Sequence, residues 1–481
     1  MTVLEYAALN YQKDVTDLVE FLRIPSISTL PEHRPDMQRA AEWVAERLRR
    51  LGMDGVAIYP TAGHPVVYGE WSQAGPAAPT LLVYGHYDVQ PVDPLDLWKS
   101  PPFEPTIVGD NLYARGAADD KGQLFIHLAA AQALIHRSGN LPVNIKYLFE
   151  GEEEIGSPHL DEFIDSHADL LAADVAVISD SHILGPDQPA IVYALRGLAY
   201  IEVHVYGPSR DLHSGIYGGA VHNPIQALCE LIASLHDAEA RVIIPGFYSK
   251  VRPLEPDERA DLARIPFSTD QWLEETGVPA PYGEPDYTIV ERTSARPTLE
   301  INGIWGGFTG AGGKTVIPAE AHAKISMRLV PDQEPQEIAD LVAAHLKAIA
   351  PPTVRVEISE LHHGDGAIIP RDIPAMQAAR AAYRAAFGAD PVFMREGGSI
   401  PVVATFQKIL AIPTVMLGFG LPDDNLHSPN EKFNLQNFRR GVATVIHFLT
   451  SLGGQAAGQG VATDAWPESS EVSEDFGSLT P

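Results

Sequence analysis

Four groups of acidic and histidine side chains follow four apolar, strand-like runs of this sequence. The runs span residues 81–85, 143–149, 175–178 and 414–420, and the groups after them include His86, Asp88, Glu153, Glu154, Asp180 and His427. In parallel α/β sheets, functional side chains collect just beyond the carboxyl ends of the strands. Carboxylates and imidazoles gathered in this way predict a hydrolytic site that holds two metal ions.

The candidate metal ligands are three carboxylates and two imidazoles, contributed by His86, Asp119, Glu154, Asp180 and His427. Two divalent cations roughly 3.5–4 Å apart can share a carboxylate and a hydroxide that is nucleophilic at neutral pH. Three carboxylates against two dications leave one positive charge, which the bridging hydroxide neutralises. Zinc is the first choice of metal, although manganese and cobalt suit the same ligands and spacing does not choose among them.

Glu153 is the candidate general base, because it adjoins Glu154 and projects in another direction if the backbone is extended. Each of these residues has a simpler explanation when taken alone. Asp119 and Asp120 could cap the helix that follows them, and residues 152–154 could form a solvated turn. Only the joint placement of the acids and histidines favours a metal site.

The elements that must position these residues alternate between strand and helix patterns up to about residue 195. Helical spacing of apolar residues is clear over 37–51 and 123–136, and the strand-like runs lie between such segments. This alternation predicts an α/β fold in which a mostly parallel sheet is flanked by helices. The same pattern resumes near residue 364, with a helix over 373–387, so His427 returns to the first domain.

Between these two parts the pattern changes to that of an inserted α+β domain. Alternating runs at 200–206 and 323–329 predict strands with one face open to solvent or a partner. A helix is expected over 335–349, whereas residues 243–307 show no clear periodicity. We therefore predict a catalytic domain formed by 1–196 and 364–452, an inserted lid or dimerisation domain, 197–363, and a flexible tail, 453–481.

Composition narrows the possible functions. The chain has 481 residues and a formal net charge of −29, which favours two domains and argues against a nucleic-acid partner. No apolar stretch is long enough to span a membrane, and the first residues lack the features of a signal peptide, so we expect a cytoplasmic protein. The lone cysteine, Cys229, excludes an intrachain disulfide, and we expect its thiol to be buried.

Several segments resemble the M20 family of metallopeptidases, in particular its carnosinase and cytosolic nonspecific dipeptidase branch. The matching segments are 85–91, 115–122, 150–157, 211–215, 396–401 and 427–431. They occur in the family's order, and the resemblance extends over roughly residues 10–450.

This resemblance implies a role for each candidate ligand. Asp119 corresponds to the ligand that bridges the two metals. Glu154 and His427 then complete one metal site, and His86 and Asp180 complete the other.

The resemblance also implies roles for the residues around the ligands. Glu153 corresponds to the general base, Asp88 to a carboxylate that orients the catalytic groups, and Glu152 to a residue without a catalytic part. A cis peptide bond is expected between Asp119 and Asp120.

Four further residues correspond to substrate-binding positions of the family. His213 matches an imidazole that stabilises the oxyanion from the neighbouring subunit of a homodimer, and Thr315 matches another contact from that subunit. Arg328 corresponds to the residue that grips the terminal carboxylate of the peptide, and Ser399 could offer backbone N–H groups to the same carboxylate.

The predicted activity is hydrolysis of the peptide bond in dipeptides or short peptides by a metal-bridging hydroxide, with Glu153 as the base. An N-acyl-amino-acid deacylase of the same family is the alternative, because its metal residues would look identical. The long segment 243–307 favours the dipeptidase, since simpler deacylases lack it. A metal-binding protein without activity is less well supported, because Glu153 and Asp119 are both present.

Overall fold

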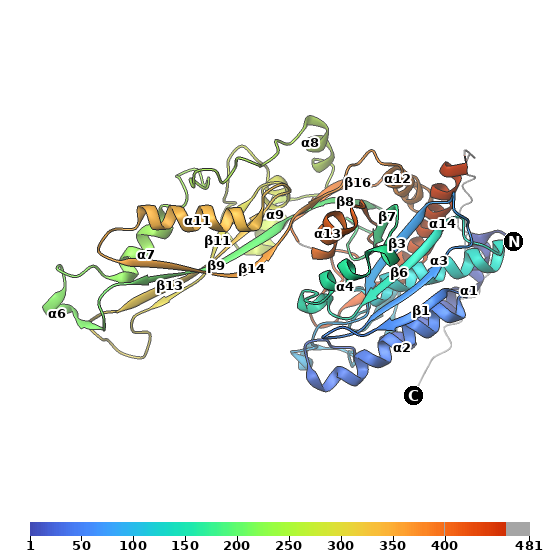
Figure 1. The fold of residues 1–481 in the computed structure, drawn as a ribbon, viewed down its shortest axis with the longest axis horizontal. Helices are drawn as coiled ribbons and strands as arrows, with labels where there is room; N and C mark the ends of the chain where they lie inside the picture. The colour runs from blue at the N-terminus through green and yellow to red at the C-terminus, as the bar shows by residue number, and fades with distance from the viewer. Residues whose placement is uncertain (399, 458–481) are drawn as a thin grey trace. The chain divides into compact units, whose positions relative to one another are not determined.

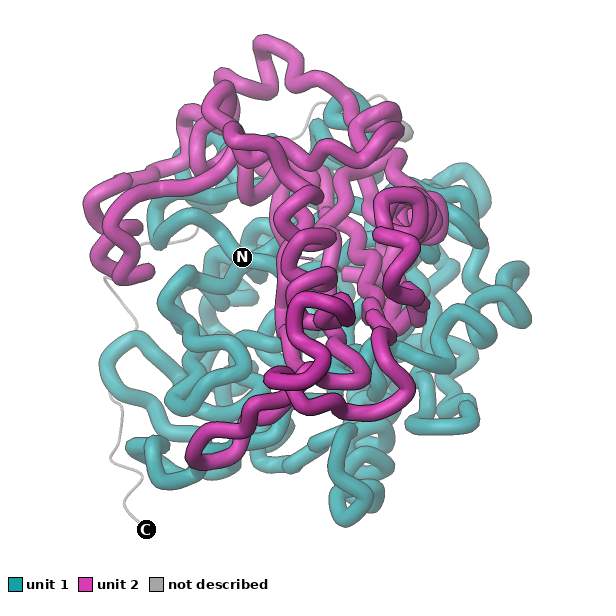
Figure 2. Tube along the Cα trace, turned by 90° about the vertical axis from the view of Figure 1, so that its left-hand side faces the viewer, with its two compact units in different colours: residues 1–193, 369–393, 405–481 teal, residues 194–368, 394–404 magenta. Residues whose placement is uncertain are grey.

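The computed structural model describes residues 1–398 and 400–457, and these form two compact units (Figures 1 and 2). Unit 1 comprises residues 1–193, 369–393 and the described chain from 405 onward; unit 2 comprises 194–368 and 394–404. Within the predicted tail, residues 453–457 are helical, and residues 458–481 lie outside the described part. No helix in the described ranges combines the length and hydrophobicity needed to cross a bilayer.

Unit 1 is built on a six-stranded sheet (Figure 1). Its strands, in spatial order, are β1 (Asp54–Tyr59), β2 (Val66–Trp71), β6 (Asn144–Glu150), β3 (Thr80–His86), β7 (Val175–Ile178) and β17 (Thr414–Met416). The last four run parallel to one another, whereas β2 is antiparallel to both of its neighbours, β1 and β6. The prediction of a mostly parallel sheet with flanking helices is confirmed.

Helices surround this sheet. The longer ones are α1 (Val3–Leu22), α2 (Arg34–Arg50), α3 (Lys121–Ser138), α12 (Pro374–Phe387) and α14 (Leu435–Ala457). Shorter helices are α4 (Leu160–Ser166), α5 (Ala168–Leu171), η1 (Pro31–His33), η2 (Leu95–Leu97), η3 (Glu153–Ile155) and η4 (Phe406–Leu410). α3 packs on β3 and is itself covered by α1 and α14, which explains why its first fourteen residues, 121–134, are all buried.

The parallel strands bring the predicted polar groups to one edge of the sheet. His86 is the last residue of β3 and pairs in register with Glu150, the last residue of β6. Asp180 follows β7 closely, and α3 begins directly after Asp119 and Asp120. A small sheet of β4 (Thr106–Val108), β5 (Asn111–Tyr113) and β18 (Lys432–Asn434) ties the chain near His427 to the chain before Asp119.

Unit 2 contains a four-stranded antiparallel sheet (Figure 1). Its strands, in spatial order, are β11 (Thr298–Gly306), β13 (Glu320–Leu329), β9 (Gly197–Tyr206) and β14 (Arg355–Gly364). Alternate residues of β9 and β13 are buried, and α7 (Pro224–Ala233) and α11 (Pro335–Ile349) cover that face. Most of the alternate residues on the other face of these strands are polar, among them Glu202, His204, Lys324 and Arg328.

Two expectations about this unit were wrong. The sequence showed no strand within 243–307, yet β11 lies there; an irregularity between Ile301 and Gly303 interrupts its alternation, and most of its side chains are exposed. Cys229 is exposed rather than buried. The apolar run around it covers more than one face of α7, and the face that packs on the sheet carries Leu228 and Leu231.

The remaining elements are short. Unit 2 also contains β10 (Leu212–His213), β12 (Val316–Ile317), α6 (Ser214–Tyr217), α8 (Pro256–Leu262), α9 (Thr269–Thr276) and α10 (Ile289–Ser294). The chain passes between the units within or beside β8 (Ala190–Leu195), β15 (Ala367–Ile368), β16 (Val392–Glu396) and α13 (Pro401–Thr405).

Candidate metal centre

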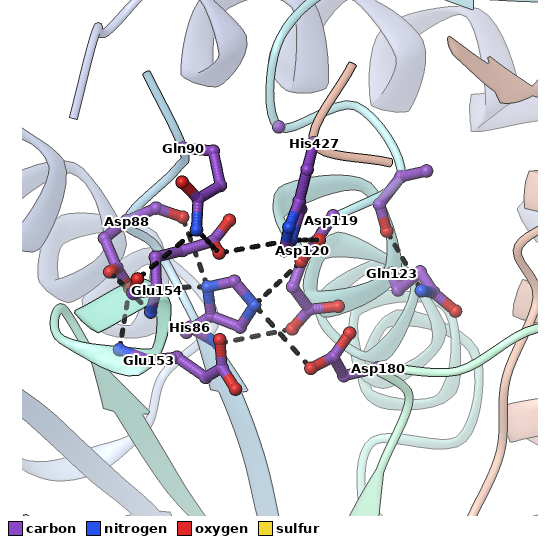
Figure 3. A network of polar contacts seen from close by, with 12 residues as sticks. His86, Asp88, Gln90, Asp119, Asp120, Gln123, Glu153, Glu154, Asp180 and His427 are labelled. Carbon is purple, nitrogen blue, oxygen red and sulfur yellow. Dashed lines mark hydrogen bonds and ion pairs between the residues drawn. The ribbon is translucent and has the colours of Figure 1, made fainter. Parts of the chain in front are cut away.

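Asp119 lies at the centre of the candidate site, with an imidazole facing each of its carboxylate oxygens (Figure 3). Its Oδ1 is 3.1 Å from His86 Nε2, and its Oδ2 is 3.1 Å from His427 Nε2. Beyond these, Asp180 Oδ2 lies 3.8 Å from His86 Nε2 and Glu154 Oε2 lies 3.3 Å from His427 Nε2. The structure therefore brings all five candidate ligands together.

The five side chains form two overlapping groups that share Asp119. His86, Asp119 and Asp180 make one group, and Asp119, Glu154 and His427 make the other; in each, the ligand atoms lie within 4.8 Å of one another. Such separations suit side chains that converge on a common ion, and the donor set of imidazole and carboxylate suits zinc, manganese or cobalt. The residues present therefore fit a pair of divalent ions with Asp119 as the shared ligand.

The electrostatics of the cluster also favour bound cations. Hydrogen bonds with Asp119 and Glu154 raise the pKa of His427 to about 10. Burial lowers the pKa of His86, but hydrogen bonds with Asp119 and Asp88 outweigh it and the pKa is raised overall. For Asp119, burial acts to raise the pKa of the carboxyl group, but the hydrogen bonds with His427 and His86 outweigh it and hold the pKa below its usual range. The carboxylates thus stabilise positive charge on the two imidazoles around Asp119.

Glu431 holds the segment that carries Asp119. One carboxylate oxygen of this buried residue accepts hydrogen bonds from the Arg115 guanidinium at 2.9 Å and the Gly116 N–H at 3.0 Å. The other accepts from the N–H groups of Ala118 and Asp119, at 3.0 and 3.2 Å. Glu431 ends the family motif 427–431, but the sequence alone indicated no role for it. Its position four residues after a candidate ligand was the available signal, but its partners lie more than 300 residues earlier.

Asp88 orients the segment that carries Glu153 and Glu154. Its two carboxylate oxygens accept the backbone N–H groups of Glu153 at 3.3 Å and Glu154 at 3.1 Å. The same side chain lies 3.3 Å from His86 Nδ1. Gln90, for which no role was predicted, donates from Nε2 to Glu154 Oε2 at 2.7 Å. These contacts fix the direction in which Glu153 and Glu154 project.

The three consecutive glutamates have different surroundings. Figure 3 shows Glu153 and Glu154 pointing toward the cluster. Burial raises the pKa of Glu153, with further contributions from the charges of Asp180 and Asp119. Glu152 instead accepts the His64 N–H at 3.1 Å and pairs with His159 Nδ1 at 2.8 Å, so its carboxylate is engaged outside the cluster.

The peptide bond between Asp119 and Asp120 is cis, as the resemblance implied. Asp120 is buried and accepts the backbone N–H of His86 at 3.2 Å. Gly122 follows in the first turn of α3, where a Cβ atom would lie 2.0 Å from the Ala117 carbonyl oxygen. This close approach requires glycine.

Three of the predicted substrate contacts, His213, Thr315 and Arg328, lie in unit 2, apart in sequence from the metal cluster. His213 is exposed at the end of β10, which pairs with β12 next to the exposed Thr315. The Thr315 carbonyl oxygen accepts the Ser214 N–H at 3.1 Å. Arg328 is partly exposed on β13, opposite Leu198 and Thr298. Ser399 lies outside the described residues.

Comparison with known proteins identifies the class of protein that carries this centre. Residues 82–451 match the model of Peptidase family M20/M25/M40. Because the match spans well over half of the sequence, the chain belongs to this family, as the resemblance predicted.

Individual relatives extend over nearly the whole chain. The Cys-Gly metallodipeptidase dug1 of Schizosaccharomyces pombe is 35% identical over 473 residues, covering 93% of this chain and 98% of its own. The Beta-Ala-His dipeptidase of Homo sapiens is 32% identical over 470 residues, covering 94% and 92%. The M20 family metallo-carboxypeptidase Sso-CP2 from Sulfolobus solfataricus superposes with a TM-score of 0.79 at 34% identity, covering 92% of this chain and 99% of that structure.

We predict that the Glu431 carboxylate supports metal binding although it does not itself bind a metal. In Glu431→Gln, an amide NH₂ would face backbone N–H donors, and the segment ending at Asp119 would lose acceptors. We expect zinc affinity, measured by competition with a chromogenic chelator, to fall about 10–100-fold, as for other groups that orient ligands. Glu104→Gln, an exposed carboxylate of the same unit, is the control. Unchanged affinity in a folded Glu431→Gln protein would contradict this role.

Proposed function

We propose that the chain is a metal-dependent dipeptidase whose catalytic centre is the cluster around Asp119. The observation that carries this proposal is the position of the Asp119 carboxylate, with one oxygen toward His86 and the other toward His427. The relatives named Cys-Gly metallodipeptidase and Beta-Ala-His dipeptidase, which match over more than nine-tenths of the chain, support dipeptides as the substrate class.

Membership of a metallopeptidase family implies divalent ions, and we propose that two of them occupy the cluster, zinc being the first choice. His86 and Asp180 would hold one, Glu154 and His427 the other, and Asp119 both. Bound there, such ions supply the Lewis acidity that polarises a peptide carbonyl and lowers the pKa of water.

Glu153 would then move the proton. The Glu153 backbone N–H donates to the Asp88 carboxylate. The Glu153 carboxylate points toward the cluster, and burial raises its pKa. A carboxylate in this position can take a proton from the attacking water and deliver it to the leaving nitrogen. The neighbouring Glu154 is excluded from this task if it binds metal.

Unit 2 would supply the groups that recognise the rest of the substrate. His213 Nδ1 accepts the Gly215 N–H at 2.9 Å, so the neutral imidazole carries its proton on Nε2. That N–H is a donor suited to a developing oxyanion.

We propose that His213 and Thr315 act on the site of a partner subunit in a homodimer, and that Arg328, with backbone groups at Ser399, binds the terminal carboxylate. This would make 197–363 the lid and dimerisation domain. The cytoplasmic location stays a prediction from the sequence.

The choice of substrate tests the proposed function directly. We expect the metal-loaded enzyme to hydrolyse unblocked dipeptides faster than N-acyl amino acids, with no activity after chelation and recovery when zinc, manganese or cobalt is restored. Activity confined to N-acyl amino acids would establish the deacylase instead. Release of single residues from the carboxyl end of longer peptides, at rates above those for dipeptides, would favour the carboxypeptidase activity of the Sulfolobus solfataricus relative.

Glu153→Gln separates metal binding from proton transfer. The amide keeps the shape of the side chain but cannot accept the water proton, so kcat for a dipeptide should fall by about 100–10,000-fold. Metal content, measured by atomic emission, should be unchanged. Glu162→Gln, at an exposed position on α4, provides the control. A Glu153→Gln enzyme with near-normal kcat would show that another group is the base.

Subunit mixing tests the placement of His213. His213→Ala and Glu153→Gln proteins should each be inactive, but unfolding and refolding them together should restore activity. Random pairing into dimers makes half of the molecules mixed, each with one intact site, so about a quarter of wild-type activity is expected. No recovery in dimers shown to be mixed, or full activity in a monomer, would place the function of His213 within its own chain.

A further inference from the structure

The polar face of the unit 2 sheet carries a second group of potential metal ligands. Glu202 and His204 lie on β9, and His322 lies directly opposite His204 on β13. One ligand atom from each of the three side chains lies within 4.8 Å of the other two. These residues belong to none of the segments that carry the family resemblance, and the proposed dipeptidase mechanism does not use them.

The two imidazoles present the same nitrogen to each other. His204 Nδ1 is 2.9 Å from His322 Nδ1, and Glu202 Oε1 is 3.7 Å from His204 Nδ1. A tetrahedral zinc ion with bonds of about 2.0–2.1 Å would hold two nitrogens roughly 3.3 Å apart. The pair would therefore need to open by only a few tenths of an ångström to accept an ion.

The outer nitrogen of each ring faces an oxygen. His322 Nε2 lies 3.5 Å from Glu320 Oε1, and His204 Nε2 lies 3.2 Å from Ser359 Oγ. A carboxylate only accepts hydrogen bonds, so Glu320 favours the His322 tautomer that has its proton on Nε2 and a lone pair on Nδ1. Imidazoles that bind metals usually donate their other N–H to an oxygen in this way, which fixes the ring and the tautomer.

Aromatic neighbours hold both rings in place. Trp305 stacks on His322, with centroids 5.1 Å apart and planes 19° apart, and Tyr206 lies nearly parallel to His204, with centroids 6.4 Å apart. The side chains of His204 and His322 are only 18% and 13% exposed. Because the rings are already ordered, binding an ion would cost little further side-chain entropy.

We propose that Glu202, His204 and His322 bind a transition-metal ion, Zn²⁺ or one with a similar preference for imidazole, at a site separate from the cluster of unit 1. The ion would join the two central strands of the unit 2 sheet. The competing explanation of the geometry is a hydrogen bond in which the two imidazoles share one proton. It requires no metal, so metal stoichiometry distinguishes the two explanations.

The test compares zinc uptake by full-length variants. Metal-stripped wild-type, His322→Ala and His362→Ala proteins are dialysed against the same zinc buffer near neutral pH, and bound zinc per chain is measured by atomic emission. We expect His322→Ala to bind one equivalent fewer than wild type, whatever number the unit 1 cluster holds. His362→Ala, an exposed histidine on β14 of the same sheet, should match wild type. Dipeptide hydrolysis should be equal in all three, which separates this site from the proposed catalytic centre.

A second variant keeps the test decisive if removal of an imidazole disturbs the sheet. Glu202→Gln retains both rings and their aromatic contacts but lacks the negative charge, so its affinity for the extra zinc should fall at least tenfold. Equal stoichiometry and affinity in wild type, His322→Ala and Glu202→Gln would overturn the proposal and leave the shared proton as the explanation.

Discussion

The contact on which the candidate centre depends is the one between the Asp119 carboxylate and two imidazoles that approach from different parts of the chain. His86 ends a strand in the first fifth of the sequence, and His427 comes from the carboxyl-terminal part, yet each faces one oxygen of the same side chain. A buried carboxylate is costly unless its partners are well placed. The sheet, the buried helix α3 and the four hydrogen bonds to Glu431 all limit where Asp119 can lie.

The same arrangement explains why the centre is suited to binding cations. Carboxylates outnumber imidazoles around Asp119. Burial raises the pKa of Glu153 and Glu154, and the charge of nearby carboxylates, Asp119 among them, raises both further. Divalent ions would remove this imbalance, so metal binding and the stability of unit 1 should be linked. The shifted pKa values gather where the chemistry is proposed, as expected of sites that tune the pKa of catalytic groups.

Much of this could be predicted from the sequence, and the failures have physical causes. His86 and Asp180 follow short apolar runs, and parallel strands of a sheet end at a common edge, so their proximity follows from the pattern. The role of Glu431 could not be predicted, because it depends on backbone N–H groups that only the folded chain brings near. The strand β11 was not predicted, because the irregularity between Ile301 and Gly303 interrupts the alternation of its residues. Cys229 was misplaced because an apolar run does not show which face of a helix packs.

An anomalous difference map from crystals of the zinc-loaded protein would locate the bound ions. We expect two strong peaks, both in contact with Asp119: one bounded by His86 and Asp180, the other by Glu154 and His427. Unit 1 would then hold its ions through one shared carboxylate. A single peak there, or zinc bound only at positions that do not touch Asp119, would show that Asp119 is not a ligand shared by two metals.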